Sequence, residues 1–334
     1  MNTTPTDRVK LVGEARNRLA AWSEGAQALS LLSSVHRLGW TRFLREPRSF
    51  EELVRHSAIP PQRLRDGLDA LVRLEIVEQT DDEFRLTAPF AEMLTSDGLL
   101  NLGDKLDEAR LMARLVGEAV EVNELPMLSG DDALTVARGA TFQATEVGRA
   151  VFRETLNDVP EYTAAVAQGR VLDVGCGVAS GLLTTAALFP TIHGLGLELV
   201  PAVAAEAARR AAAQGVAERI EIRTADARRF DETAAYDACF WAQPFFGADA
   251  RLPTLRAIHR ALAPGGILLE QELDRKPTDA AQASAFALRR VVFHGWGAPF
   301  ASTAEHLAVE AQAVGFTLVR IATTNLGRMV VLRR

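Results

Sequence analysis

The sequence predicts an α/β protein in which a mostly helical half precedes a parallel sheet covered by helices. Two observations carry this prediction. From about residue 169 onward, runs rich in β-branched residues alternate with helical stretches, as in a series of βαβ units. Before about residue 160 the patterns are nearly all helical, with one short pair of strands. The length of 334 residues corresponds to about two domains, which agrees with this change of pattern.

The first half is expected to form a winged helix, because several helices are followed by a hairpin. The expected elements are helices at 11–21 and 26–39, helices after Ser49 and after Pro60-Pro61, and strands at 76–79 and 83–86. Ser49 fits a helix N-cap, and Glu52 follows at the spacing of a capping box. In the helix after the two prolines, Leu64, Leu68, Leu71 and Leu74 share one face, which predicts the side that packs on the core.

The second half alternates strands and helices. The expected strands are Arg170–Val174, Ile192–Leu197, Ile220–Ile222, Tyr236–Trp241, Ile267–Glu270, Phe316–Ile321 and Arg328–Leu332. The expected helices are Gly181–Phe189, an alanine-rich helix that ends near Gly215, Leu252–Leu262 and Ala304–Val314. A short turn joins the last two strands, which predicts an antiparallel pair at one edge of the sheet.

The composition excludes several classes of protein. Hydrophobic residues make up 48% and charged residues 24%, an ordinary globular balance. The net charge of −6 gives no overall positive field for nucleic acid or anionic lipid. Cys176 and Cys239 cannot form a disulfide framework, and no apolar run is long enough to span a membrane. The first residues do not resemble a secretory signal, so we expect a cytoplasmic protein without nucleic-acid or membrane partners.

A glycine turn follows the first strand of the second half. Gly175 and Gly177 let the backbone turn sharply and let a ligand approach closely. A dinucleotide site would have a third glycine where this chain has Ser180, and the carboxylate of Asp173 would repel a pyrophosphate. The same carboxylate suits a cationic amine or a sulfonium. These two residues therefore argue against a nicotinamide-dependent oxidoreductase.

Two further acids stand at the ends of the next strands. Glu198 ends the second strand, where a carboxylate can accept hydrogen bonds from two ribose hydroxyls. Asp226, followed by Ala227, comes after the third strand and can accept a hydrogen bond from an adenine amino group. Asp226 also fits a helix N-cap, and the two roles are compatible.

These motifs resemble those of the class I S-adenosylmethionine-dependent methyltransferases. The resemblance covers about residues 168–334 and includes the turn 262–266, Leu-Ala-Pro-Gly-Gly, before the fifth strand. It implies a Rossmann-like, seven-stranded methyltransferase sheet and S-adenosylmethionine as the cofactor. It also implies that the methionine end is held by Asp173, Gly175 and Gly177, the ribose by Glu198, and the adenine by Asp226 and Ala227.

With its helical first half, the whole chain is similar to the small-molecule O-methyltransferases and their bacterial natural-product relatives. The resemblance implies a winged-helix and dimerisation domain at 1–105, linking helices at 106–165 and the catalytic domain at 166–334. In that group the first domain usually makes an intertwined homodimer and helps to close the substrate pocket. The helical half also has more apolar faces than one winged helix can bury, which favours a homodimer.

The chain departs from this group at the expected catalytic base. The plant enzymes place a histidine just past strand four, whereas residues 240–246 read Phe-Trp-Ala-Gln-Pro-Phe-Phe. The candidates for catalytic contact are therefore Gln243 and His294, which lies in a segment where this fold commonly builds its substrate wall. No histidine pair has metal-ligand spacing, so no metal is expected.

Aromatic residues supply the remaining candidates. Trp241 ends strand four and could face the sulfonium through a cation–π contact, or it could belong to the core. Phe152 and Tyr162 lie on the segment that leads into the first strand and are candidate cofactor or substrate contacts.

We expect methyl transfer to a small, partly apolar metabolite by proximity and desolvation. Two alternatives stay open. The missing histidine permits an enzyme whose substrate is S-adenosylmethionine itself, with an intramolecular displacement that gives a cyclic product and methylthioadenosine. The other alternative is a nucleotide-sensing winged-helix regulator. Residues 61–86 contain four arginines and seven acidic residues, and this net charge of −3 opposes DNA binding.

Overall fold

The computed structural model describes residues 4–128 and 130–334. The chain divides into two compact units. One contains the residues up to Ser96 together with Asn101–Leu106, and the other contains Asp97–Leu100 together with Asp107–Arg334. Nearly all of the segment expected to link the two halves belongs to the second unit. The division into three parts at residues 105 and 165 stays a prediction.

The first unit combines helices with a small antiparallel sheet of order β1-β3-β2. Its elements are α1 (Pro5–Arg37), α2 (Trp40–Phe43), β1 (Arg48–Ser49), α3 (Phe50–Ser57), α4 (Pro61–Arg73), β2 (Val77–Thr80), β3 (Glu83–Leu86) and α5 (Ala88–Glu92). Helix α1 is one continuous helix where the sequence patterns predict two. The helices and the hairpin follow the expected order, and the assignment as a winged helix stays a prediction.

The capping box predicted before α3 is confirmed. The backbone N–H of Ser49 donates to Glu52 Oε2 at 2.8 Å, and the backbone N–H of Glu52 donates to Ser49 Oγ at 3.3 Å. The predicted apolar face of α4 is confirmed as well, since Leu64, Leu68 and Leu71 are all buried in the core of this unit. Local sequence signals therefore determine both the start of α3 and the packing of α4.

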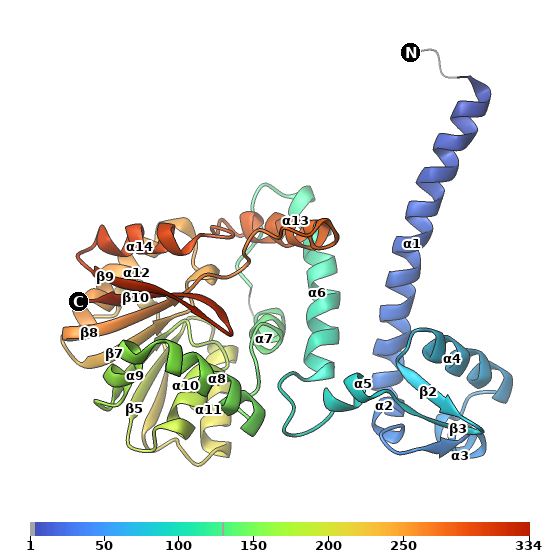
Figure 1. Ribbon diagram of the computed structural model, residues 1–334, viewed down its shortest axis with the longest axis horizontal. Helices are drawn as coiled ribbons and strands as arrows, with labels where there is room; N and C mark the ends of the chain where they lie inside the picture. Colours follow the sequence, from blue (N-terminus) through green and yellow to red (C-terminus); the bar gives the residue numbers. More distant parts are fainter. Residues whose placement is uncertain (1–3, 129) are drawn as a thin grey trace. The chain divides into compact units, whose positions relative to one another are not determined.

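The second unit is a seven-stranded sheet with helices on both faces, which confirms the predicted α/β fold (Figure 1). The strands are β4 (Arg170–Val174), β5 (His193–Glu198), β6 (Ile220–Thr224), β7 (Tyr236–Trp241), β8 (Leu262–Gln271), β9 (Thr317–Thr324) and β10 (Gly327–Arg333). The helices are α6 (Leu102–Glu121), which begins in the first unit, α7 (Gly130–Gly139), α8 (Glu146–Asp158), α9 (Pro160–Val166), α10 (Ser180–Leu188), α11 (Pro201–Ala213), α12 (Ala248–Ala261), α13 (Ala280–Gly295) and α14 (Ala304–Gln312), with short 3₁₀ turns η1 (Ala227–Arg229) and η2 (Gln243–Phe245).

The sheet order is β6-β5-β4-β7-β8-β10-β9. Strands β4 to β8 pair in parallel, and β10 pairs antiparallel with β8 and β9, so the predicted antiparallel edge is confirmed. Buried residues of α12 and α14 pack on one face of the sheet, and those of α8 to α11 pack on the other. Because the parallel strands run in one direction, their carboxyl ends meet at one edge, where ligands bind in open α/β sheets.

The structure also differs from the sequence prediction at α13, α12 and β8. Helix α13 was not predicted, although Asp279 caps it by accepting a hydrogen bond from the backbone N–H of Ala281 at 2.9 Å. Helix α12 begins at Ala248, four residues earlier than expected, and carries Pro253 in its interior. Strand β8 begins at Leu262, so the turn predicted before this strand lies within it. No helix in the described ranges is both long and apolar enough to cross a membrane.

The cap of α3 gives a direct test of the first unit. Ser49→Ala should lower the free energy of unfolding by about 1 kcal/mol, because the backbone N–H of Glu52 loses its acceptor. Urea unfolding followed by circular dichroism measures this change. Ser284→Ala, at an exposed position of α13, serves as the control and should change the free energy by less than about 0.5 kcal/mol. An equal effect of both substitutions would contradict the capping role.

Candidate functional site

The predicted cofactor residues lie on neighbouring strands at one edge of the sheet. Asp173, near the end of β4, is in register with Gly196 of β5 and Phe240 of β7. Glu198 ends β5 and is in register with the last residue of β6, two positions before Asp226. The sheet register therefore brings the carboxyl ends of β4, β5 and β6 together, as the alternation of strands and helices predicts.

The glycine turn after β4 uses a backbone conformation that favours glycine. Gly175 has φ = 71° and Gly177 has φ = 57°, and both values lie in the left-handed region. At Gly175 a Cβ atom would also lie 2.8 Å from Cε2 of Phe246, so a side chain would displace that ring. Ala179, which follows in the same turn, has φ = 60° although it is not a glycine, and it carries the strain of this region. Two glycines of the turn are thus required by its geometry.

Asp173 is a buried carboxyl group without a cationic partner among the described residues. It is 5% exposed, and burial raises its pKa to about 7, with a further increase from the negative charge of Glu198. The backbone N–H of Leu182, in the first turn of α10, donates to it and opposes this increase. A cation placed beside Asp173 would lower the pKa and stabilise the ionised form. The site is therefore suited to a positively charged group.

Tyr162 lies in the same surroundings. It is buried on α9, and its pKa is raised well above 10, first by burial and then by the negative charge of Asp173. Phe152 of α8 is partly buried and packs against Phe142, with 6.2 Å between the ring centroids. The contact of either residue with a cofactor stays a prediction.

Glu198 is hydrogen-bonded to the protein backbone. Its Oε2 accepts from the N–H of Gly177 at 3.0 Å, and its Oε1 accepts from the N–H of Val200 at 2.9 Å. These bonds fix the carboxylate beside the glycine turn. Each oxygen retains acceptor capacity, because a carboxylate can accept about four hydrogen bonds. The predicted role in binding ribose hydroxyls is compatible with this placement and stays a prediction.

Asp226 has both a structural partner and a charge partner. It caps η1 by accepting from the N–H of Arg228 at 3.0 Å, which confirms the predicted N-cap. Its carboxylate also pairs with the guanidinium of Arg228 at 2.8 Å, and this hydrogen bond lowers its pKa. Ala227 is buried beside it. The adenine role of Asp226 and Ala227 stays a prediction, and it requires the carboxylate to serve a third partner.

Trp241 and Gln243 are almost inaccessible to solvent. Trp241 is fully buried; the edge of Phe246 packs on it at 5.4 Å, and the guanidinium of Arg251 lies 5.1 Å from its ring. Gln243 is 3% exposed, and both ends of its amide are occupied: Nε2 donates to the carbonyl of Gln271 at 3.1 Å, and Oε1 accepts from Arg251 Nη1 at 2.8 Å. Their cofactor and catalytic roles stay predictions.

A buried polar network contacts the loop after β7 and was not predicted as part of the site. Arg251 is 2% exposed and donates to the carbonyl of Gln243 at 2.9 Å and to Glu310 Oε1 at 2.9 Å. Glu270, in register with Trp241, is fully buried, and the described residues offer neither of its oxygens a hydrogen bond. Burial raises the pKa of Glu270 to about 8, although the charge of Arg251 opposes this, so Glu270 is mostly protonated at pH 7. The sequence places Glu270 at the end of the fifth expected strand, and this position could have identified it as a site residue.

Helix α13 brings aromatic residues to the loop after β7. Phe293 packs on Phe245 at 5.9 Å, on Trp296 at 5.4 Å and on Phe300 at 5.2 Å between ring centroids. The neighbouring His294 is exposed, and its side chain has no hydrogen bond or ion pair within the described residues. An aromatic cluster thus forms around Phe293, and the catalytic role of His294 stays a prediction.

Residues 171–266 match the family model described as a methyltransferase domain. This segment of the chain is a methyltransferase domain. The chain is 27% identical over 332 residues to the N,N-dimethyltransferase OxyT of Streptomyces rimosus, with 95% of this chain and 94% of that protein covered. It is 38% identical over 127 residues to a release factor glutamine methyltransferase of Cereibacter sphaeroides, but it spans only 45% of that relative and 35% of itself in this match.

Solved structures extend the likeness of fold beyond the methyltransferase domain. The structure of the mitomycin 7-O-methyltransferase MmcR is 21% identical and matches with a TM-score of 0.65, covering 98% of this chain and 99% of that one. The chain therefore shares its fold over nearly its whole length with small-molecule O-methyltransferases.

The raised pKa of Asp173 predicts pH-dependent cofactor binding. An ionised Asp173 attracts the cationic methionine end, so affinity for S-adenosylmethionine should rise as the pH increases through about 7. Well below that pH the affinity should fall by up to about tenfold per pH unit. The stability of the protein without ligand should change in the opposite direction. Folding favours the neutral form of Asp173, so the free energy of unfolding should fall as the pH rises from about 4 to about 7.

Titration calorimetry between pH 5.5 and 8.5 measures this dependence. Asp173→Asn should bind the cofactor weakly and with little change across the range. Glu270→Gln is the matched control, because Glu270 also titrates near this range, and it should keep the dependence of the wild-type protein. The same pH dependence in Asp173→Asn would show that another group controls binding.

Proposed function

We propose that this protein transfers the methyl group of S-adenosylmethionine to a small, partly apolar metabolite of the natural-product type. The observation that carries the proposal is the group formed by the glycine turn, buried Asp173 and Glu198 at the ends of β4 and β5. A buried carboxylate with a raised pKa fits a cationic ligand, and the φ of 71° at Gly175 gives the sharp turn that such a site needs. The likeness to MmcR supports a small acceptor, since its name gives mitomycin as the molecule that it methylates.

The protein's own contribution is binding, orientation and exclusion of water. Asp173 would hold the methionine end, Glu198 the ribose, and Asp226 with Ala227 the adenine. The cofactor supplies a methyl group that its sulfonium already activates. Phe246, which lies against Gly175, presents an aromatic ring to this end of the site, and such rings stabilise cations.

The loop after β7 contributes no side chain that could remove a proton. Gln243 is bonded at both ends, and the neighbouring Phe245 and Phe246 are apolar. A neutral amine can attack a methyl group without a base, whereas an alcohol would need one. OxyT is named for methylation at nitrogen and MmcR for methylation at oxygen, so the relatives support either acceptor atom. Proximity and desolvation are the contributions that this loop can make.

Mass spectrometry after incubation of the protein with S-adenosylmethionine alone separates the proposal from its main alternative. We expect intact cofactor, or S-adenosylhomocysteine, to be retained without turnover, because no acceptor is present. Asp173→Ala and Glu198→Ala should retain at least about tenfold less, since each removes a charged binding group. Steady release of methylthioadenosine above the uncatalysed rate would instead identify the cofactor as the substrate of an intramolecular displacement.

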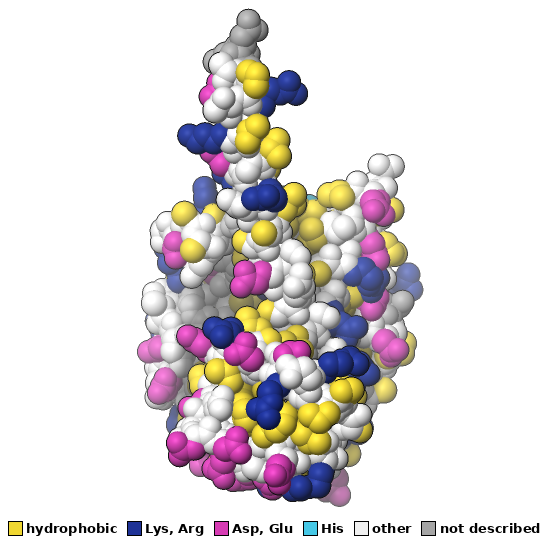
Figure 2. All heavy atoms as spheres, turned by 90° about the vertical axis from the view of Figure 1, so that its right-hand side faces the viewer, with side chains coloured by type: hydrophobic (Ala, Val, Ile, Leu, Met, Phe, Trp, Pro, Cys, Tyr) yellow, Lys and Arg dark blue, Asp and Glu magenta, His cyan; other side chains and the backbone are white. Residues whose placement is uncertain are grey.

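We also propose that the protein is a homodimer through its first unit. The part of α1 before residue 25 has almost no buried side chain, and five of its large apolar residues are exposed: Val9, Leu11, Val12, Leu19 and Trp22. Figure 2 shows apolar side chains along this helix. Removing them from water against a second copy would stabilise an assembly. The acidic hairpin of this unit would repel nucleic acid, which disfavours nucleic acid as a partner.

Light scattering coupled to size-exclusion chromatography tests the assembly. The wild-type chain should have twice the mass of one chain, and the double substitution Leu19→Glu and Trp22→Glu should reduce it to one. Val309→Glu places the same charge at an exposed apolar position of α14 and should leave the dimer intact. A wild-type monomer would refute the proposal, and a dimer that survives the double substitution would exclude α1 as its interface.

A further inference from the structure

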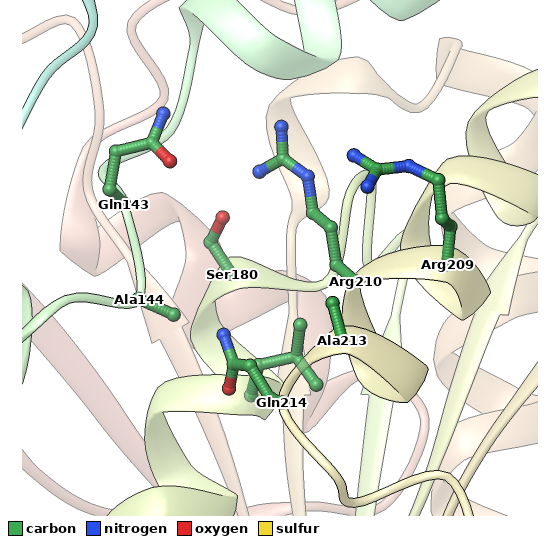
Figure 3. A pocket seen from close by; sticks show the side chains of 8 residues that line it. Gln143, Ala144, Ser180, Arg209, Arg210, Ala213 and Gln214 are labelled. Atoms are coloured by element: carbon green, nitrogen blue, oxygen red, sulfur yellow. The ribbon is translucent and has the colours of Figure 1, made fainter. Parts of the chain in front are cut away.

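A pocket of about 220 Å³ lies between α10, α11 and the loop before α8 (Figure 3). We call it the arginine pocket, and its lining residues are Gln143, Ala144, Ser180, Leu183, Arg209, Arg210, Ala213 and Gln214. It is smaller than the roughly 300 Å³ at which sites for whole organic ligands begin. Its size therefore suits a small ion or one functional group of a larger molecule.

The charges around the arginine pocket are unequal. Glu206 accepts from Arg209 Nε at 2.7 Å and from Arg210 Nε at 2.9 Å, and it lies 3.5 Å from Arg138 Nη2. These arginines, Arg209 first, lower the pKa of Glu206 to about 2, so it is ionised at all ordinary pH values. Three guanidinium groups thus surround one carboxylate, and none of the lining residues is acidic. The local surplus is positive in a chain whose net charge is −6.

Arg210 directs hydrogen-bond donors into the arginine pocket. Its side chain is 17% exposed, and only Nε donates to Glu206. The described residues provide no acceptor for its two terminal nitrogens. In Figure 3 the guanidinium of Arg210 lies on the same side of the pocket as the side chains of Ser180 and Gln143. The head group is therefore poised to donate to something that is not part of the chain.

The hydroxyl of Ser180 is a second, independent sign of a ligand. Ser180 is 2% exposed, and its Oγ is buried without a hydrogen-bond partner in the described part of the chain. A buried polar group is nearly always paired, so an unpaired one that lines a pocket indicates a missing partner.

We propose that the arginine pocket binds a phosphate group, either as the free ion or as part of a small phosphate ester. Guanidinium donors match the geometry of phosphate oxygens and form strong charge-assisted hydrogen bonds with them. The Ser180 hydroxyl supplies a neutral donor to the same ligand. None of the expected cofactor residues lines the pocket, although Ser180 directly follows the glycine turn. The inference is independent of the proposed transfer reaction.

Titration of the full chain with inorganic phosphate, at an ionic strength held constant with sodium chloride, tests the site. Phosphate should raise the Tm, and calorimetry should give a dissociation constant in the millimolar range or below. Arg210→Gln should weaken binding by about tenfold, because one charge-assisted contact is lost. Ser180→Ala should weaken it about threefold and leave the Tm without phosphate unchanged or higher, since the unpaired hydroxyl is removed.

Arg256→Gln is the matched control, because it removes the same charge from an exposed position of α12. It should bind phosphate as the wild-type chain does. Titration with glycerol 3-phosphate distinguishes the two sources: tighter binding than free phosphate assigns the site to an ester, and equal binding assigns it to the ion. A Tm that rises equally with chloride, or phosphate binding that is unchanged in both Arg210→Gln and Ser180→Ala, would overturn the proposal.

Discussion

The ligand-binding edge of this protein depends on one unfavourable interaction, the burial of Asp173 near a second carboxylate. Burial and the charge of Glu198 both disfavour the ionised form of Asp173, and they raise its pKa to about 7. The surrounding contacts partly compensate: Leu182 donates to Asp173, and Gly177 and Val200 donate to Glu198. A positive ligand would remove the remaining cost. The features of this edge are therefore consistent with one another when the ligand is a cation.

The loop after β7 completes the edge from the other side. Arg251 holds the loop by donating to Gln243, and Glu310 holds Arg251 in turn. This arrangement keeps the ring of Phe246 against Gly175. The ring can lie there because glycine has no side chain. An aromatic ring takes the place of a charged base in this loop. The loop can shield the site from water and contact a cation, and an acceptor that is already nucleophilic suits it best.

The sequence predicted the features that depend on local pattern. The bounds of β4 and β7, the glycine turn and the capping box at Ser49 are all as expected, because periodicity and turn residues determine them. Contacts between segments that are distant in the sequence could not be predicted. The approach of Phe246 to Gly175 joins residues about seventy positions apart, and Glu270 lies between β7 and β10, which come from distant parts of the sequence. Helix α13 was missed although Asp279 marks its start, since residues 280–285 hold no apolar side chain larger than alanine.

Helix α10 lies between two regions of opposite charge. At its first turn the N–H of Leu182 donates to the carboxylate of Asp173, while Ser180, two residues earlier, faces the arginine pocket. Asp173 has no ion pair with an arginine among the described residues, whereas Arg209 and Arg210 both pair with Glu206. One helix can therefore border a site for a cation and a site for an anion, because each charged region has its own local partners.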